Sequence, residues 1–278
     1  MKHLKRSMSF ILALFLLNMF TTITVEASDN ITLSNFDYVH YADNYPDLKA
    51  AYGYDAKALY SHYKNLGRAE GRLGIRTRAS YLPMASFDDD LYASENPDVV
   101  SAVGISKKNL YNHYQNFGQY EGRSAWSTNS SINAQLKAYD IVVTTTNGSM
   151  PEYERIRAVH DWIVKNVHYN VPAYTSGNFS DSDYTAVGPL LMGTGVCSGY
   201  ADAFAQCMDV MGIENRKPYS DNHQWNEVKL SDGIYRSIDV CWDDPIPDSG
   251  YAVPYYTYFM ISSDQMSQYD CHNIIGYE

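Results

Sequence analysis

The sequence of 278 residues has little of several features that mark common protein classes. It holds only four cysteines, too few for a small disulfide-stabilised scaffold, and no C-x-x-C pair that would favour a zinc site. Its 21 basic residues are outnumbered by 32 acidic ones, and the net charge of −11 argues against nucleic-acid binding. After residue 27, no apolar run is long enough to cross a bilayer. We therefore expect neither a nucleic-acid partner nor a stable membrane span.

The first 27 residues carry the longest apolar run of the chain. Lys2, Lys5 and Arg6 precede this run, which extends over residues 8–20 and is followed by small residues in "TTITVEAS". This order predicts a secretory signal peptide, residues 1–27, cleaved after Ala27. An uncleaved anchor is the alternative, but the run is shorter than the ~20 residues that a spanning helix needs. We expect a secreted, extracellular protein, either released or associated with the cell surface.

The chain repeats itself at an offset of 51 residues, without a gap. Residues 36–72, "FDYVHYADNYPDLKAAYGYDAKALYSHYKNLGRAEGR", match residues 87–123, "FDDDLYASENPDVVSAVGISKKNLYNHYQNFGQYEGR". Each unit predicts a two-helix hairpin. The first helix ends at Gly53 or Gly104, and the second follows an N-cap at Asp55 or Ser106 and stops at Gly67 or Gly118. Residues 28–123 are thus predicted to form a small all-α domain.

The repeats carry histidines and many tyrosines whose roles the sequence leaves open. His62 and His113 occupy equivalent positions and are expected to be packed or capping residues, with metal binding as the alternative. Most of the tyrosines are expected in the core, although exposed rings would suit stacking on sugars. Such a unit cannot bury its apolar face alone, so the repeats should pack on each other or on the catalytic region. A cell-wall or glycan ligand is one expectation for this domain.

The second half of the chain predicts an α+β domain, residues 136–278, after a polar linker at 124–135. Apolar residues at helical spacing predict a helix over about 151–167 and a buried helix over 198–211, ending at Gly212. Downstream, "QWNEVKLSDGIYRSIDVCWDD" alternates apolar and polar residues around Asp232-Gly233, which predicts a β-hairpin. A helical layer thus precedes an antiparallel sheet.

One cysteine stands at the start of a predicted helix, in "GVCSGYADAF". Cys197 would lie near the positive end of the helix dipole, where a nucleophilic thiol is favoured. Such a thiol needs a base and a group that orients the base. His223 precedes the first hairpin strand and Asp239 lies on the second. With a two-residue turn at 232–233, facing residue numbers sum to about 465, which places Asp239 opposite Asn226, close to His223.

Three blocks of this sequence resemble the transglutaminase-like superfamily of papain-type thiol enzymes, in its bacterial secreted branch. The blocks are "YERIRAVHDWIVKNVHY", "GVCSGYADAF", and "HQWNEVKL" followed by "GIYRSIDVCWDDP". The resemblance covers about residues 136–278 and implies a papain-like core with Cys197 as nucleophile, His223 as general base and acid, and Asp239 as orienting carboxylate. Cys241 stands where the family commonly has threonine.

Other residues near the blocks have weaker assignments. The oxyanion of an acyl-transfer intermediate needs two donors, for which the backbone N–H of Cys197 and the side chain of Tyr169 are candidates. Trp225 and Trp242 are expected to form the wall of the site. The remaining polar residues are expected to be structural or unliganded: His160, His168, Asp243 and Asp244. No calcium-binding spacing is found, and we expect neither a metal nor a cofactor.

The remaining cysteines raise the question of disulfides. Cys197 and Cys207 lie ten residues apart on one predicted helix, a rise of about 15 Å that no disulfide spans. Cys241 with Cys271 is the pair left to consider. A zinc or disulfide cluster of all four is a weaker alternative.

The expected function is thiol acyl transfer on glutamine carboxamide or peptide bonds of extracellular proteins. A lysine acceptor would make the protein a transglutaminase, and water would make it a cysteine peptidase or amidase. The alternative from another class is a cell-surface or glycan-binding protein whose triad is idle.

Overall fold

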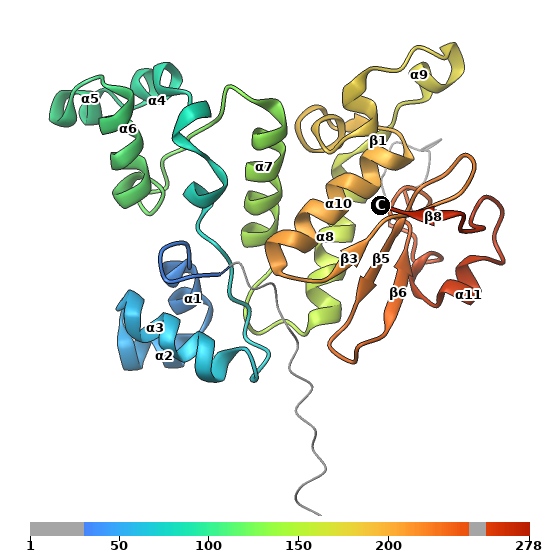
Figure 1. Ribbon diagram of the computed structural model, residues 1–278, viewed down its shortest axis with the longest axis horizontal. Helices are drawn as coiled ribbons and strands as arrows, with labels where there is room; N and C mark the ends of the chain where they lie inside the picture. Colours follow the sequence, from blue (N-terminus) through green and yellow to red (C-terminus); the bar gives the residue numbers. More distant parts are fainter. Residues whose placement is uncertain (1–30, 245–253) are drawn as a thin grey trace, which may run out of the picture.

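A computed structural model describes residues 31–244 and 254–278 (Figure 1). The predicted signal peptide, residues 1–27, lies outside the described residues. The helices of the first half are α1 (Tyr38–Asn44), α2 (Pro46–Tyr52), α3 (Ala56–His62), α4 (Asp89–Glu95), α5 (Pro97–Val103) and α6 (Lys107–His113). Those of the second half are α7 (Ser130–Thr145), α8 (Glu152–Asn166), α9 (Val171–Ser176), α10 (Cys197–Met211) and α11 (Ser263–Met266). The strands are β1 (His168–Tyr169), β2 (Thr194–Gly195), β3 (Asn215–Arg216), β4 (Pro218–Tyr219), β5 (Asn226–Lys229), β6 (Tyr235–Ile238), β7 (Phe259–Ile261) and β8 (Gly276–Tyr277).

Each repeat consists of three short helices rather than the predicted two-helix hairpin. The first helical run is interrupted at Pro46 and at Pro97, because proline starts a helix easily but cannot continue one. The predicted N-caps are confirmed, since the side chains of Asp55 and Ser106 accept hydrogen bonds from the first turns of α3 and α6. A single π-helical turn then leads to Gly67 or Gly118.

The equivalent histidines of the repeats are packed side chains, as expected. His62 Nδ1 lies 3.1 Å from the hydroxyl of Tyr41, and His113 Nδ1 lies 3.0 Å from that of Tyr92. Each repeat has its own small apolar core. Its buried tyrosines are Tyr41, Tyr45 and Tyr63 in the first repeat and Tyr92, Tyr111 and Tyr114 in the second.

The repeats also pack on the second half of the chain through α7 (Figure 1). Leu73 and Ile75, which follow the first repeat, belong to the same core as α7, α8 and α10. The hydroxyl of Tyr139 on α7 donates to Asp37 at 2.6 Å. Residues 130–135 lie in α7, and Ala125 is buried, so the predicted linker at 124–135 is wrong over much of its length.

A helical layer packs against a sheet in the second half, and the α+β expectation is confirmed at this level. The predicted helices are α8, with Val167 at its C-cap, and α10, which ends at Gly212. Their apolar faces form the main core with α7. Ile163 and Phe204 are fully buried there, and each such side chain contributes about 1.5–3 kcal/mol to folding.

The main sheet is antiparallel, with strand order β3-β5-β6-β7. The predicted hairpin is β5–β6, but its register differs by one residue from the prediction. Asn226 pairs with Ile238 rather than with Asp239. The reason is a three-residue loop: the backbone N–H of Leu230 donates to the carbonyl of Ile234, and Gly233 adopts the left-handed φ of 79° that such loops require.

Two short pairings complete the architecture. Strands β1 and β2 pair in parallel, with Tyr169 opposite Gly195. Strand β8, near the C-terminal end, pairs with β4, with Gly276 opposite Tyr219. Among residues 31–244 and 254–278, no helix is both long and apolar enough to span a membrane.

Candidate active site

Cys197 is the first residue of α10, and the close packing of that helix start explains the surrounding glycines. A Cβ on Gly199 would lie 2.4 Å from the backbone oxygen of Asp183, so only glycine allows the two segments to approach this closely. The Asp183 carboxylate accepts from the backbone N–H of Ser180 at 2.8 Å and from the Asn170 amide at 2.7 Å. The helix start is therefore fixed, and its dipole favours negative charge on the Cys197 sulfur.

His223 and Asp239 come from the two sides of the β5–β6 hairpin. His223 is separated from the start of β5 by two residues, and Asp239 directly follows β6. The Nε2 atom of His223 lies 2.5 Å from Oδ2 of Asp239, and both side chains are buried. The other carboxylate oxygen, Oδ1, accepts from the backbone N–H of Trp242 at 3.0 Å. The predicted base and orienting carboxylate are therefore hydrogen-bonded.

Cys197 joins this pair, because its side chain lies close enough to His223 to raise the pKa of that imidazole. Since Nε2 of His223 is engaged by Asp239, Nδ1 is the ring nitrogen left for an interaction with the sulfur. A further bond holds the two elements together: the Asn226 amide on β5 donates to the carbonyl of Ala201 in α10 at 2.9 Å. The structure thus brings the three predicted triad residues together.

The electrostatics of the pair favour an ion pair of imidazolium and carboxylate. Burial alone lowers the pKa of His223, but the charge and hydrogen bond of Asp239, with the Cys197 contact, raise it to about 10. Burial alone raises the pKa of Asp239, but two neighbouring imidazoles lower it to about 2. At neutral pH, His223 is therefore protonated, the form that stabilises a thiolate.

The predicted wall residues also lie at the triad. The Trp225 ring stacks on that of His223 with centroids 5.8 Å apart, and the Trp242 ring lies 5.3 Å from it. Tyr169 is held beside the Cys197 helix by the β1–β2 pairing. Burial is the largest cause that raises the pKa of Tyr169, and the negative charge of Cys197 raises it further. The Tyr169 hydroxyl therefore keeps its proton and can donate a hydrogen bond.

A comparison with protein-family models matches residues 139–240 to the transglutaminase-like superfamily. The resemblance predicted from the sequence is thus confirmed over residues 139–240. The matched segment contains Tyr169, Cys197, His223 and Asp239. A search of curated proteins found no match.

Among solved structures, the chain is similar to a crystal structure of a TGase. The identity is 12%, the TM-score is 0.36, and the match covers 53% of this chain. It spans only 42% of that chain.

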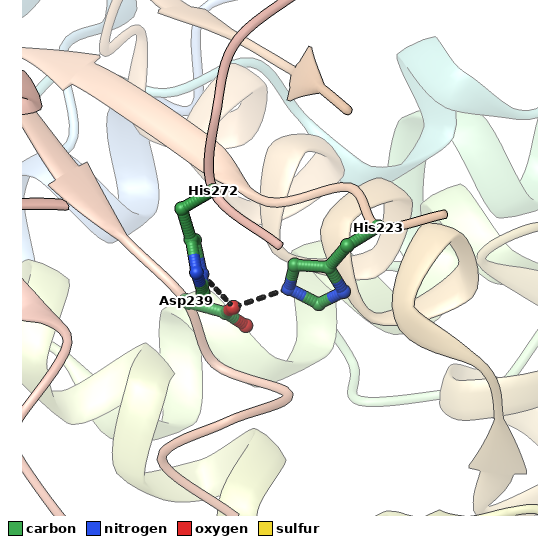
Figure 2. A group of neighbouring side chains, drawn as sticks. All are labelled: His223, Asp239 and His272. Carbon is green, nitrogen blue, oxygen red and sulfur yellow. Dashed lines mark hydrogen bonds and ion pairs between the residues drawn. The ribbon is translucent and has the colours of Figure 1, made fainter. Parts of the chain in front are cut away.

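The transglutaminase-like domain has a fourth polar residue at the triad that the sequence analysis missed. Nε2 of His272 lies 2.9 Å from the same Oδ2 of Asp239 that binds His223. Figure 2 shows the two imidazoles approaching this oxygen from different sides. His272 lies in "QYDCHNIIGYE", outside the three recognisable blocks, and no spacing in the sequence connects it with Asp239.

His223, Asp239 and His272 also form a set of potential metal ligands. One donor atom from each lies within 4.8 Å of the others, and imidazole nitrogen with carboxylate oxygen is a donor set that zinc accepts. The sequence predicts no metal, and Asp243 and Asp244 are its only acidic candidates for one. Both have other partners: Asp243 lies 3.2 Å from His160, and Asp244 accepts from the Tyr200 hydroxyl at 2.6 Å.

The histidines expected to be structural and the remaining cysteines lie apart from the triad chemistry. His160 is fully buried on α8, whereas His168 is exposed at the start of β1. All four cysteines are free, so the considered Cys241–Cys271 disulfide is not formed. Burial raises the pKa of Cys207 inside α10, which leaves it an inert thiol.

Proposed function

We propose that the transglutaminase-like domain is a thiol acyl-transfer enzyme that acts on glutamine carboxamide or peptide bonds of extracellular proteins. The observation that carries this proposal is the hydrogen-bonded pair of His223 and Asp239 beside Cys197, whose sulfur lies at a helix N-terminus. Superfamily membership supports acyl transfer or peptidase chemistry for the same residues.

The first half of the reaction forms a thioester. The Cys197 thiolate attacks the carboxamide or peptide carbonyl, and the carbonyl π electrons move to oxygen. When the tetrahedral intermediate collapses, the C–N bond breaks and Nδ1–H of His223 gives its proton to the leaving nitrogen. Asp239 stays ionised and holds the imidazole in place.

The negative oxygen of the tetrahedral intermediate needs donors that are already in place. The backbone N–H of Cys197 starts α10 and therefore has no intrahelical carbonyl to bind. The Tyr169 hydroxyl is the proposed second donor, since it is protonated and lies near the sulfur. Trp225 and Trp242 exclude water from the imidazole face.

In the second half of the reaction, His223 takes a proton from the acceptor as that acceptor attacks the thioester. A lysine amine gives a cross-link, which is transglutaminase activity, and water gives hydrolysis, which is peptidase or amidase activity. We propose amine transfer first and hydrolysis as the alternative.

The setting of the enzyme is also part of the proposal. An extracellular location follows from the predicted signal peptide, and the repeats are proposed to bind cell wall or glycan. Exposed rings such as Tyr52 and Tyr54, which are 42% and 49% exposed, would suit sugar stacking. A binding protein with an idle triad is the competing function.

The test is incubation of the protein, beside Cys197→Ala, with a glutamine-containing protein and a biotinylated primary amine, followed by mass spectrometry. Cysteine-dependent incorporation of the amine supports transglutaminase activity. Cysteine-dependent cleavage or deamidation without incorporation supports the hydrolase. Identical products from the two proteins, over a panel of protein substrates, would favour the binding protein.

A further inference from the structure

We propose that His272 is a positioning residue of this site, which holds the Asp239 carboxylate from a second side through a hydrogen bond to Oδ2. The inference rests on the proposed thiol chemistry and adds a fourth residue to the triad. Its consequence is that the carboxylate that orients His223 is itself held in place.

The hydrogen-bond partners of His272 determine where its protons lie. Nδ1 is 2.8 Å from the backbone oxygen of Asp270, and Nε2 is 2.9 Å from Oδ2 of Asp239. A carbonyl oxygen and an ionised carboxylate only accept hydrogen bonds. Because the pKa of Asp239 is lowered to about 2, its carboxylate is ionised at neutral pH. Nε2 of His272 therefore donates to the Asp239 carboxylate, and the contact of Nδ1 with the Asp270 carbonyl fixes the ring from its other side.

Aromatic rings surround the His272 ring on several sides. The ring is fully buried, 4.7 Å from Trp242 and 4.8 Å from Trp225. It also stacks on Tyr258 with an interplanar angle of 9°. Close packing of this kind restricts the ring to one orientation, in which Nε2 points at Asp239.

The backbone that carries His272 is strained and tied to the His223 loop. Cys271 has a φ of 64°, which is unusual for a residue with a side chain and recurs at functional sites. Its carbonyl accepts from the Ser220 hydroxyl at 2.6 Å, and the Ser220 N–H donates to the carbonyl of His223 at 2.8 Å. Ser220 thus connects the segments that carry His223 and His272. The nearby pairing of β4 with β8 supports this connection.

The test compares the rate and pH profile of iodoacetamide labelling at Cys197 in the full chain, read by mass spectrometry of the Cys197 peptide. His272→Gln keeps a single neutral donor, and His272→Phe keeps only the ring. We expect labelling at pH 6 to fall by about 10-fold or more in the first, in the range seen for residues that orient catalytic groups, and further in the second.

The matched control is His160→Gln, which alters another fully buried imidazole that lies next to an aspartate. It should keep the parent's pH profile, and thermal unfolding of every variant separates lost folding from lost positioning. Folded His272→Phe with the parent's rate and profile would overturn the inference. If Cys197 in His223→Ala is also labelled at the parent's rate, the proposed triad is contradicted as well. If only the His272 variants are labelled at the parent's rate, the inference about His272 is wrong and the triad stands.

A second measurement needs no variant. In the ¹⁵N NMR spectrum of the histidine-labelled full chain, Nε2 of His272 should have the shift of a protonated nitrogen. An unprotonated Nε2, or a stoichiometric metal found by elemental analysis of the purified protein, would contradict the hydrogen bond assigned between His272 and Asp239.

Discussion

The charge state of the buried pair makes a residue-scale prediction about pH and stability. The pKa of His223 rises from its ordinary 6.5 to about 10 on folding, so its contribution to stability is full below pH 6.5 and is lost as the pH rises toward 10. The pKa of Asp239 falls from 3.8 to about 2, so its contribution is present above pH 3.8 and is lost toward pH 2. Urea unfolding at several pH values measures both contributions to the free energy of unfolding.

The control for this prediction is His223→Ala. Its stability should change less than that of the parent between pH 6.5 and 10, since the variant lacks the group that titrates there. Identical slopes for the two proteins in this range would show that the imidazole is not charged in the folded state.

At this scale the triad could be predicted because its residues stand in short, recognisable blocks. Cys197 precedes an apolar helical pattern, and His223 and Asp239 flank a hairpin with an Asp-Gly turn. His272 could not be predicted, because it approaches Asp239 only through the pairing of β8 with β4 and the packing of its ring among aromatic side chains. Neither leaves a periodic pattern in the sequence.

At the scale of elements, the start of α10 depends on the absence of a side chain at Gly199. Gly199→Ala would place a methyl group 2.4 Å from the backbone oxygen of Asp183, where no flexible side chain can yield. We expect a loss of about 1–3 kcal/mol in the free energy of unfolding, and slower Cys197 labelling because the helix start must shift. Denaturant unfolding and the labelling rate measure the two effects.

The neighbouring residue supplies the control for that substitution. The Ser198 hydroxyl is buried without a hydrogen-bond partner, so Ser198→Ala removes an unsatisfied group from the same helix turn. It should change stability by no more than about 1 kcal/mol, toward higher stability. If Gly199→Ala is as stable and reactive as Ser198→Ala, the close packing of this helix start is not required.

The elements themselves were predicted best where periodicity was strong. The bounds of α8 and α10 agree with the sequence pattern, since their buried apolar residues recur at helical spacing. Two details were missed for local reasons. Pro46 and Pro97 divide the first helix of each repeat, and the hairpin loop includes Ser231 as a third residue, which shifts the register by one.

At the scale of the whole molecule, the repeats are part of the core of the second half rather than a separate module on a linker. Leu73 and Ile75 pack in the core of the transglutaminase-like domain, and Arg78 binds Asp140 of α7 at 2.8 Å. The polar composition of residues 124–135 resembles a linker, but the sequence could not show that α7 already begins there.

A fragment of residues 129–278 therefore should expose the face of α7 that the repeats cover. We expect a lower midpoint of thermal unfolding than in the full chain, or aggregation, because the apolar surface left by Leu73 and Ile75 meets water. A fragment of residues 73–278 keeps both side chains and the second repeat, and should be more stable. Equal midpoints for fragment 129–278 and the full chain would show instead that the repeats are an independent module.

The central claim is that His223 and Asp239 make Cys197 a reactive thiol, and its most direct test is the pH dependence of iodoacetamide labelling. In the parent, Cys197 should be labelled well below pH 8.5, the ordinary pKa of a thiol, and faster than in His223→Ala by at least about 10-fold at pH 6. The labelling rate of Asp239→Asn at this pH should lie between those of the parent and His223→Ala. Equal labelling rates in parent and His223→Ala across the whole pH range would contradict the triad and the function built on it.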